Sequence, residues 1–266
     1  YMSFTQLGLD IDGEAAGDYS GTSVSLSSDG KVIAIGAPYN DGNGANSGHV
    51  RLYEYTSSNG WTQLGADIDG AASDNEFGFS VSLSGDGTRV AIGSRGYSSW
   101  KGMVRVYERD QSEDLGWKKL GDDIIGETDS DQSGHSVAIS SDGTTVAIGA
   151  PNNDGNSDGG HVRVFQYDAN KSSNISDQNS ESFGPIGWNR IGKDINVDQN
   201  NFSGNSVTLN SDGTIVAIGS HKNDENGSNT GEVRVYKRDS TESLGWKKMG
   251  EDINGKGQGD FFGHSV

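Results

Sequence analysis

The stretch "SVSLSSDGKVIAIGAPYNDG", Ser23 to Gly42, decides the fold of this 266-residue chain. Polar and apolar residues alternate in "SVSL", which is typical of a strand with one buried face. The run "VIAIGAP" is almost entirely apolar, which favours a strand that is covered on both faces. The Ser-Asp-Gly between the two runs favours the positive φ angles of a tight hairpin. We therefore predict two antiparallel strands, followed by a loop rich in Asn, Asp and Gly.

The same hairpin recurs along the chain. Its Ser-Val pair returns at spacings of 57, 56, 70 and 59 residues, at Ser23, Ser80, Ser136, Ser206 and Ser265. Two further extended runs follow each complete hairpin, for example "GHVRLYEY" from Gly48 and "WTQLGADI" from Trp61. Four short strands in a repeat of this length predict one blade of a β-propeller. A Trp opens each fourth run, and we expect it to fill the gap between neighbouring blades.

We predict an all-β fold, a β-propeller of four-stranded antiparallel blades. It has four complete repeats and partial blades at both ends, and we expect it to be part of a longer propeller. Residues 1–20 are interpreted as the fourth strand of a preceding blade with its linking loop. The four blades cover 21–77, 78–133, 134–203 (with a polar insert at 167–187) and 204–262, and the first strand of a further blade covers 263–266.

These repeats resemble a known family. "FGFSVSLSGDGTRVAIGS" from Phe77 and the Gly36-Ala37-Pro38 word are similar to the FG-GAP repeat of integrin α-subunit N-terminal propellers. The resemblance implies seven blades and a role in cell adhesion. Family members commonly carry a calcium loop between the first two strands, but each hairpin here has a single Asp. We interpret these residues as turn formers: Asp29, Asp86, Asp142 and Asp212.

Composition and charge exclude several partners. The formal net charge of −18 argues against nucleic acid and against an anionic membrane surface. No apolar run approaches the roughly 18 residues of a membrane span, so we expect no membrane insertion. The chain has no Cys, which leaves its compartment open.

Strand direction predicts that the long loops share one face. In an antiparallel blade, the loops between strands two and three and between strands four and one lie on the side opposite the Asp-Gly hairpins. Oxygen ligands gathered there would suit calcium as the cofactor, although Asn and Asp also dominate turns for backbone reasons. The candidate metal ligands are Asp10, Asp12, Asp18, Asn40 and Asp41.

Two other kinds of site are predicted. Tyr97 and Trp100 interrupt the loop of the second unit and are candidate ligand-binding residues, with local packing as the competing interpretation. Four sequons are candidate glycosylation sites that permit an extracellular location: Asn170, Asn174, Asn201 and Asn226.

Three functional hypotheses follow. The leading one is a non-enzymatic extracellular or cell-surface propeller for adhesion, surface structure or recognition, which binds a protein or glycan on the loop-rich face. The second is a calcium-dependent carbohydrate-binding module, and the third is a polysaccharide-acting enzyme. Other residue types take the place of His at equivalent positions in other repeats, which argues against a catalytic role for the five His. Open strands at both ends would also favour self-association.

Overall fold

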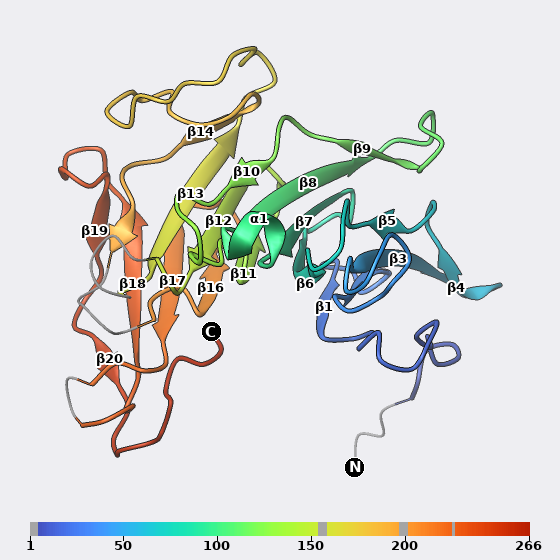
Figure 1. Cartoon of the computed structure of the whole chain (residues 1–266), viewed down its shortest axis with the longest axis horizontal. Coiled ribbons are helices and arrows are strands. Elements are labelled where there is room, and N and C mark those ends of the chain that lie inside the picture. Colours follow the sequence, from blue (N-terminus) through green and yellow to red (C-terminus); the bar gives the residue numbers. More distant parts are fainter. Residues whose placement is uncertain (1–4, 154–158, 197–201, 225–226) are drawn as a thin grey trace.

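The computed structural model describes residues 5–153, 159–196, 202–224 and 227–266. Its strands form four separate antiparallel sheets, blades 1 to 4, which follow one another in chain order from right to left in Figure 1. The all-β, blade-like architecture predicted from the repeats is confirmed. None of the described helical segments has the length and apolar character needed to span a bilayer.

Every blade has the same strand order. Blade 1 contains β1 (Ser23–Leu26), β2 (Val32–Ala37), β3 (His49–Thr56), β4 (Gly60–Gln63) and β5 (Ile68–Asp69). Blade 2 contains β6 (Phe77–Leu83), β7 (Arg89–Ser94), α1 (Tyr97–Trp100), β8 (Met103–Arg109), β9 (Trp117–Lys119) and β10 (Ile124–Ile125). Blade 3 contains β11 (Ser136–Ile139), β12 (Thr145–Ala150), β13 (His161–Tyr167), β14 (Trp188–Arg190) and β15 (Ile195–Asn196). Blade 4 contains β16 (Ser206–Leu209), β17 (Ile215–Ser220), β18 (Glu232–Arg238), β19 (Trp246–Lys248) and β20 (Ile253–Asn254).

The Asp of each hairpin acts as a turn former, as the sequence predicts. Asp29 Oδ1 accepts hydrogen bonds from Ser27 Oγ at 2.8 Å and from the Lys31 amide at 3.0 Å. The bond from the Lys31 amide is the main reason why the pKa of Asp29 is lowered. Equivalent bonds to the Asp side chain close the other three hairpins.

The fourth strand differs from the prediction because it is broken in two. Both β4 and β5 pair with β3, and the residues between them include Gly65 at a φ of +74°. This left-handed conformation interrupts an extended backbone and favours Gly. A Cβ atom on Gly65 would also lie 2.3 Å from the carbonyl oxygen of Leu115 in the next unit. The same break occurs at Gly250 of blade 4, with a φ of +73° and no atom of the described residues within 4 Å of such a Cβ, so the positive φ and not the contact accounts for the break.

The two chain ends also differ from the prediction. Residues 5–22 and 263–266 form no strand, because no neighbouring strand pairs with them. Leu7 nevertheless keeps the position of a fourth-strand residue, since its carbonyl accepts a hydrogen bond from Trp61 Nε1 at 2.8 Å.

The repeated sequence words meet at the interface between blades. Ser23 Oγ donates to the carbonyl oxygen of Gly78 at 2.8 Å, and the same bond recurs from Ser80, Ser136 and Ser206 to the next unit. A Cβ atom on Gly36 would lie 2.0 Å from that Gly78 oxygen. Gly36 of the Gly-Ala-Pro sequence and Gly78 of the Phe-Gly sequence are therefore required, because the backbones of adjacent blades touch at these two residues.

The Trp of blades 2, 3 and 4 fills this interface, as predicted, whereas Trp61 of blade 1 is only partly buried. Trp117, Trp188 and Trp246 are buried, and each indole Nε1 donates to a carbonyl of the preceding blade at 2.9 to 3.1 Å. The hydrophobic clusters likewise combine residues from two adjacent blades. The core thus lies between the sheets, and each sheet depends on its neighbours to bury its apolar side chains.

Candidate functional site

The long loops share one face, as strand direction predicts. The Gln132 amide donates to the carbonyl of Trp100 at 2.8 Å, and the Asp74 amide donates to that of Ala45 at 2.8 Å. Each of these bonds joins a loop between strands two and three to a loop between strands four and one. We call this surface the loop-rich face. It is formed by residues 38–48, 70–76, 95–102 and 126–135 and by the described residues at equivalent positions of the other units.

Among the predicted metal ligands, Asp18, Asn40 and Asp41 lie on the loop-rich face and, like Asp10, are engaged in local hydrogen bonds, whereas, within the described part of the chain, Asp12 contributes only its carbonyl oxygen, to Arg51. Asp18 Oδ2 accepts a bond from Asn40 Nδ2 at 2.9 Å, while Asp41 Oδ1 accepts one from the Asn46 amide at 2.8 Å. Asp10 Oδ1 accepts a bond from Gln6 at 2.7 Å. No three of the four described carboxylates in this set come within 4.8 Å of one another. The structure therefore brings Asp18 and Asn40 together, and a calcium site at these residues stays a prediction.

The predicted aromatic residues are the first and last residues of the short segment α1, and their side chains differ in exposure. Tyr97 is partly buried and packs against the core between blades 1 and 2, whereas Trp100 is 40% exposed. Ser98, Ser99 and Trp100 all have positive φ angles. Such backbone is strained for residues with a Cβ atom and often marks binding sites.

Arg95 joins Trp100 to other aromatic side chains. Its guanidinium lies 3.6 Å from the ring centre of Phe79 and 5.6 Å from that of Trp100. Arg95 Nε donates to Glu76 Oε2 at 2.6 Å, and Nη2 donates to Tyr39 Oη at 3.4 Å. These five residues, Tyr39, Glu76, Phe79, Arg95 and Trp100, form what we call the Arg95 cluster. Sequence reasoning missed it, and the available signal was that Arg95 replaces the Pro of Gly-Ala-Pro.

A strained backbone position presents side chains around the loop-rich face. The residue two places before the Gly that precedes each Ser-Val strand has a positive φ in every repeat: Tyr19 at 53°, Glu76 at 50°, Gln132 at 56°, Phe202 at 52° and Phe261 at 50°. Bulky residues rarely adopt this conformation. Tyr19 and Phe261 are also exposed, at 68% and 43%. At the two ends of the chain this strained position holds an aromatic side chain toward solvent, whereas Glu76 is buried.

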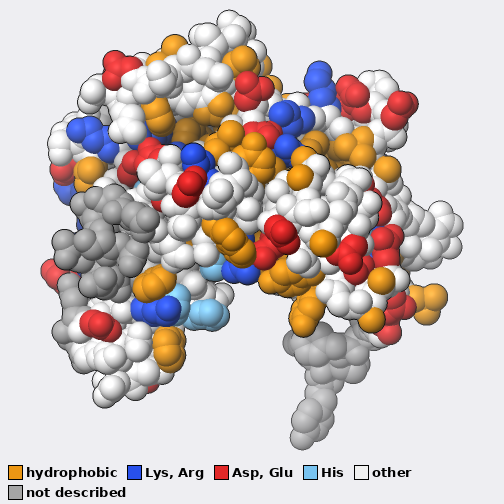
Figure 2. Space-filling view, viewed as in Figure 1, with side chains coloured by type: hydrophobic (Ala, Val, Ile, Leu, Met, Phe, Trp, Pro, Cys, Tyr) orange, Lys and Arg blue, Asp and Glu red, His pale blue; other side chains and the backbone are white. Residues whose placement is uncertain are grey.

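A second basic and aromatic group lies near blade 4. Lys222 Nζ is 3.9 Å from the ring centre of Phe202, and the rings of His221 and His264 are 5.4 Å apart. Figure 2 shows histidine side chains beside basic and hydrophobic ones in the lower left of the view. Burial, with a smaller contribution from Lys222, lowers the pKa of His221 to about 4. Burial and then Arg95 lower the pKa of His135 to about 4, so both rings are neutral at pH 7.

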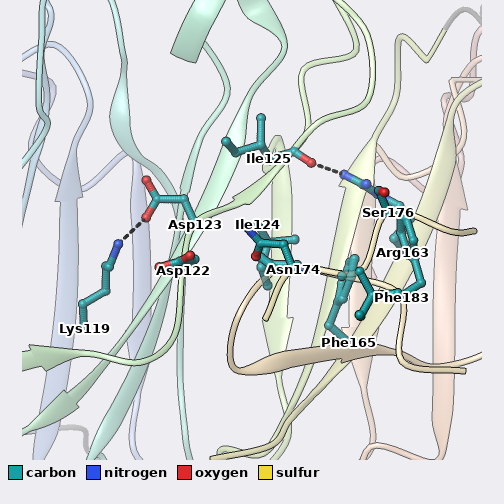
Figure 3. A pocket seen from close by; sticks show the side chains of 13 residues that line it. Lys119, Asp122, Asp123, Ile124, Ile125, Arg163, Phe165, Asn174, Ser176 and Phe183 are labelled. Atoms are coloured by element: carbon teal, nitrogen blue, oxygen red, sulfur yellow. Dashed lines mark hydrogen bonds and ion pairs between the residues drawn. The ribbon is translucent and has the colours of Figure 1, made fainter. Parts of the chain in front are cut away.

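The insert of blade 3 builds a pocket of about 480 Å³ against blades 2 and 3. Figure 3 shows Lys119, Asp122 and Asp123 on one side and Arg163, Phe165 and Phe183 on the other. The insert also carries two predicted glycosylation sites, Asn170 and Asn174, and both are exposed. The other two sequons, at Asn201 and Asn226, lie outside the described residues.

Two groups combine a His with two carboxylates, and sequence reasoning did not anticipate them. They are Glu14, His49 and Asp67, and their counterparts Glu127, His161 and Asp194. In each group one potential ligand atom per residue lies within 4.8 Å of the others.

Comparison with known proteins confirms the predicted repeat. Residues 11–53, which include β1, β2 and most of β3, match the family model described as the FG-GAP repeat. The chain contains an FG-GAP repeat. Two contacts between units are the physical basis of this repeat. They are the bond from the Ser Oγ of each Ser-Val pair to a Gly carbonyl of the next unit and the close approach of the paired Gly residues.

Solved structures support the propeller-like fold. One is a candidate 6-phosphogluconolactonase from Bacteroides uniformis ATCC 8492, with a TM-score of 0.54 and 14% identity over 88% of this chain and 54% of that one. Another is the periplasmic gluconolactonase PpgL of Pseudomonas aeruginosa, with a TM-score of 0.54 and 14% identity over 90% of this chain and 58% of that one. This chain thus spans slightly more than half the length of these neighbours, and the likeness concerns the fold alone. No curated protein matches the sequence.

Proposed function

We propose that this chain is a non-enzymatic recognition module that acts outside the cell in adhesion and binds a protein partner through its loop-rich face. The Arg95 cluster carries the proposal. Trp, Tyr and Arg are the residue types that contribute most to binding energy at protein interfaces, and this cluster places all three together beside an exposed Trp100.

The geometry of the cluster supports a pre-organised contact surface. The guanidinium of Arg95 is fixed by its bond to Glu76 and by the Phe79 ring, so little side-chain freedom remains to be lost on binding. The Glu76 carboxylate also offsets the charge of Arg95. As a binding partner, a protein surface with both polar and apolar groups is therefore favoured over a simple anion. The exposure of the sequons at Asn170 and Asn174 agrees with an extracellular location.

An array of secreted and cell-surface proteins tests this proposal, with a glycan array run in parallel with and without calcium. Three proteins are compared: the unmodified chain, Trp100→Ala, and a control, Lys31→Ala, whose exposed side chain lies on the hairpin face. We expect a protein hit whose affinity falls roughly 30-fold in Trp100→Ala, which corresponds to about 2 kcal/mol. Lys31→Ala should bind with unchanged affinity.

Equal loss or equal retention in both variants would contradict a site at the Arg95 cluster. Binding to glycans only, and only with calcium, would favour the carbohydrate-binding alternative instead. Circular dichroism spectra of both variants establish that a loss of binding is not a loss of folding.

A further inference from the structure

Strand three of blade 1 begins with a buried His that faces carboxylates from two different units. His49 is 2% exposed, and its Nδ1 lies 3.9 Å from Glu14 Oε2 and 3.8 Å from Asp67 Oδ2. These distances are too long for hydrogen bonds. They do fit two atoms that share a metal ion, because ligands about 2.1 Å from one ion lie at most about 4.2 Å apart.

Blade 3 repeats the arrangement at equivalent positions. A ring nitrogen of His161 and one oxygen each of Glu127 and Asp194 lie within 4.8 Å of one another. His161 is 2% exposed, and its buried Nε2 has no hydrogen-bond partner among the described residues. A buried polar atom without a partner is costly, and a bound ion would restore the missing interaction.

The surrounding residues orient the Asp of each group. Gln63 Nε2 donates to Asp67 Oδ1 at 2.6 Å, which leaves Oδ2 facing His49. In blade 3, Arg190 donates to Asp194 Oδ1 at 2.8 Å. Hydrogen bonds of this kind fix metal-binding carboxylates in position.

The Arg two residues after each His turns away from that Asp. Arg51 Nη2 donates to the carbonyl of Asp12 at 2.7 Å, and Arg163 Nη2 donates to the equivalent carbonyl of Ile125 at 3.0 Å. Both carbonyls belong to the preceding unit. The Asp side chain therefore remains available to the His in blades 1 and 3.

Blades 2 and 4 lack the His, and their Arg behaves differently. In blade 2, Met103 occupies the His position, and Arg105 binds both oxygens of Asp123 at 3.0 and 2.9 Å. In blade 4 the position holds Glu232, and Arg234 Nε lies 3.2 Å from Asp252 Oδ2. Where the His is absent, the Arg two residues further along strand three takes its place beside the Asp.

We propose that each His group binds one divalent transition-metal ion, with zinc as the best match, and so links adjacent units of the propeller. One imidazole nitrogen and two carboxylates suit zinc, with water completing the coordination, whereas calcium prefers oxygen ligands. The first group is surrounded by Glu14, Asp67 and Asp69 against Arg51, while the second faces Arg163 and Arg190. The first site is therefore the tighter one.

Zinc titration of the whole chain tests this proposal. After treatment with a chelator and dialysis, ZnCl₂ and CaCl₂ are titrated separately by calorimetry at pH 7.5, and thermal unfolding is followed with and without zinc. We expect two zinc ions per chain and a zinc-dependent rise in Tm. The stoichiometry should fall to one in His49→Asn and in His161→Asn, and to zero in the double variant.

Two further substitutions keep the test independent of folding defects. The Glu14 side chain is 47% exposed, so Glu14→Gln should fold normally, bind at one site fewer and lose part of the rise in Tm. His264→Asn, at an exposed His outside both groups, should retain two ions. The proposal is overturned if zinc does not bind, if calcium binds and zinc does not, or if the double variant binds zinc as the unmodified chain does.

Discussion

The strands β1 and β6 have nearly the same sequence but very different surroundings. Val24 and Leu26 of β1 are 60% and 57% exposed, whereas their counterparts Val81 and Leu83 in β6 are 8% and 7% exposed. The difference arises because β6 packs against blade 1, while the outer side of β1 has no blade against it among the described residues. The apolar residues of a repeat are thus buried by the neighbouring repeat and not within their own sheet.

The other end of the chain shows the same effect. Met249 and Ile253 of blade 4 are 44% and 52% exposed. Their counterparts in blade 3, Ile191 and Ile195, are 6% and 1% exposed, because blade 4 covers them. Matched substitutions at covered and uncovered positions therefore measure how much each interface contributes to stability.

The largest contrast is expected between Trp188→Ala and Trp61→Ala. Trp188 is fully buried between blades 2 and 3, so its removal should lower the free energy of unfolding by about 3–5 kcal/mol. Trp61 is partly exposed at the uncovered end, and its removal should cost less than half as much. Urea unfolding of both variants measures the difference, and equal losses would mean that cover by a neighbouring blade is not what stabilises the Trp.

The sequence was sufficient to predict the blades, the hairpins and the role of the Trp, because each depends on a short pattern that recurs. It did not predict the break at Gly65, where the backbone takes a positive φ of +74°. The Arg95 cluster and the His49 group were also missed. Their members come from different units, so their proximity depends on how blades pack. The Asp and Asn residues of the loops, by contrast, can either stabilise turns or bind a metal ion. Composition alone could not distinguish these two roles.

A smaller contrast is expected for Leu83→Ala and Leu26→Ala. Leu83 is almost fully buried, and its truncation should cost about 2–4 kcal/mol, in the range for a core Leu. Leu26 is mostly exposed and should cost less than about 1 kcal/mol. The shift in urea midpoint of each variant gives the comparison. A loss at Leu26 as large as that at Leu83 would show that β1 is buried in solution.

Gly78→Ala and Gly21→Ala separate backbone strain from contact between blades. Both residues have a positive φ, of 86° and 90°, so each substitution carries the same strain of about 1–2 kcal/mol. A Cβ atom on Gly78 would lie 2.6 Å from the carbonyl oxygen of His49, whereas one on Gly21 would meet nothing within 4 Å. We expect Gly78→Ala to lose a further 1–3 kcal/mol, roughly the cost of overpacking. Equal Tm values for the two variants would argue against this close approach.

A further effect concerns acid. The folded-state pKa of His135 is lowered to about 4 by burial, from an ordinary value of 6.5. The unfolded chain therefore binds more protons between these values, so stability is fully present above pH 6.5 and falls as the pH decreases toward 4. His135→Asn should flatten the dependence of Tm on pH over this range. An identical slope in His135→Asn would contradict the assignment.

The second strands of the blades give the most direct test of the account. The strands β2, β7, β12 and β17 share a similar sequence and are each paired on both sides within their sheet. Among the described residues, only blades 2 and 3 are covered by a blade on each face. Native-state amide hydrogen exchange measures the opening of each strand. If packing between blades stabilises the fold, the amides of β7 and β12 will exchange more slowly than those of β2 and β17. Equal protection in all four strands, or the strongest protection in β2, would contradict it.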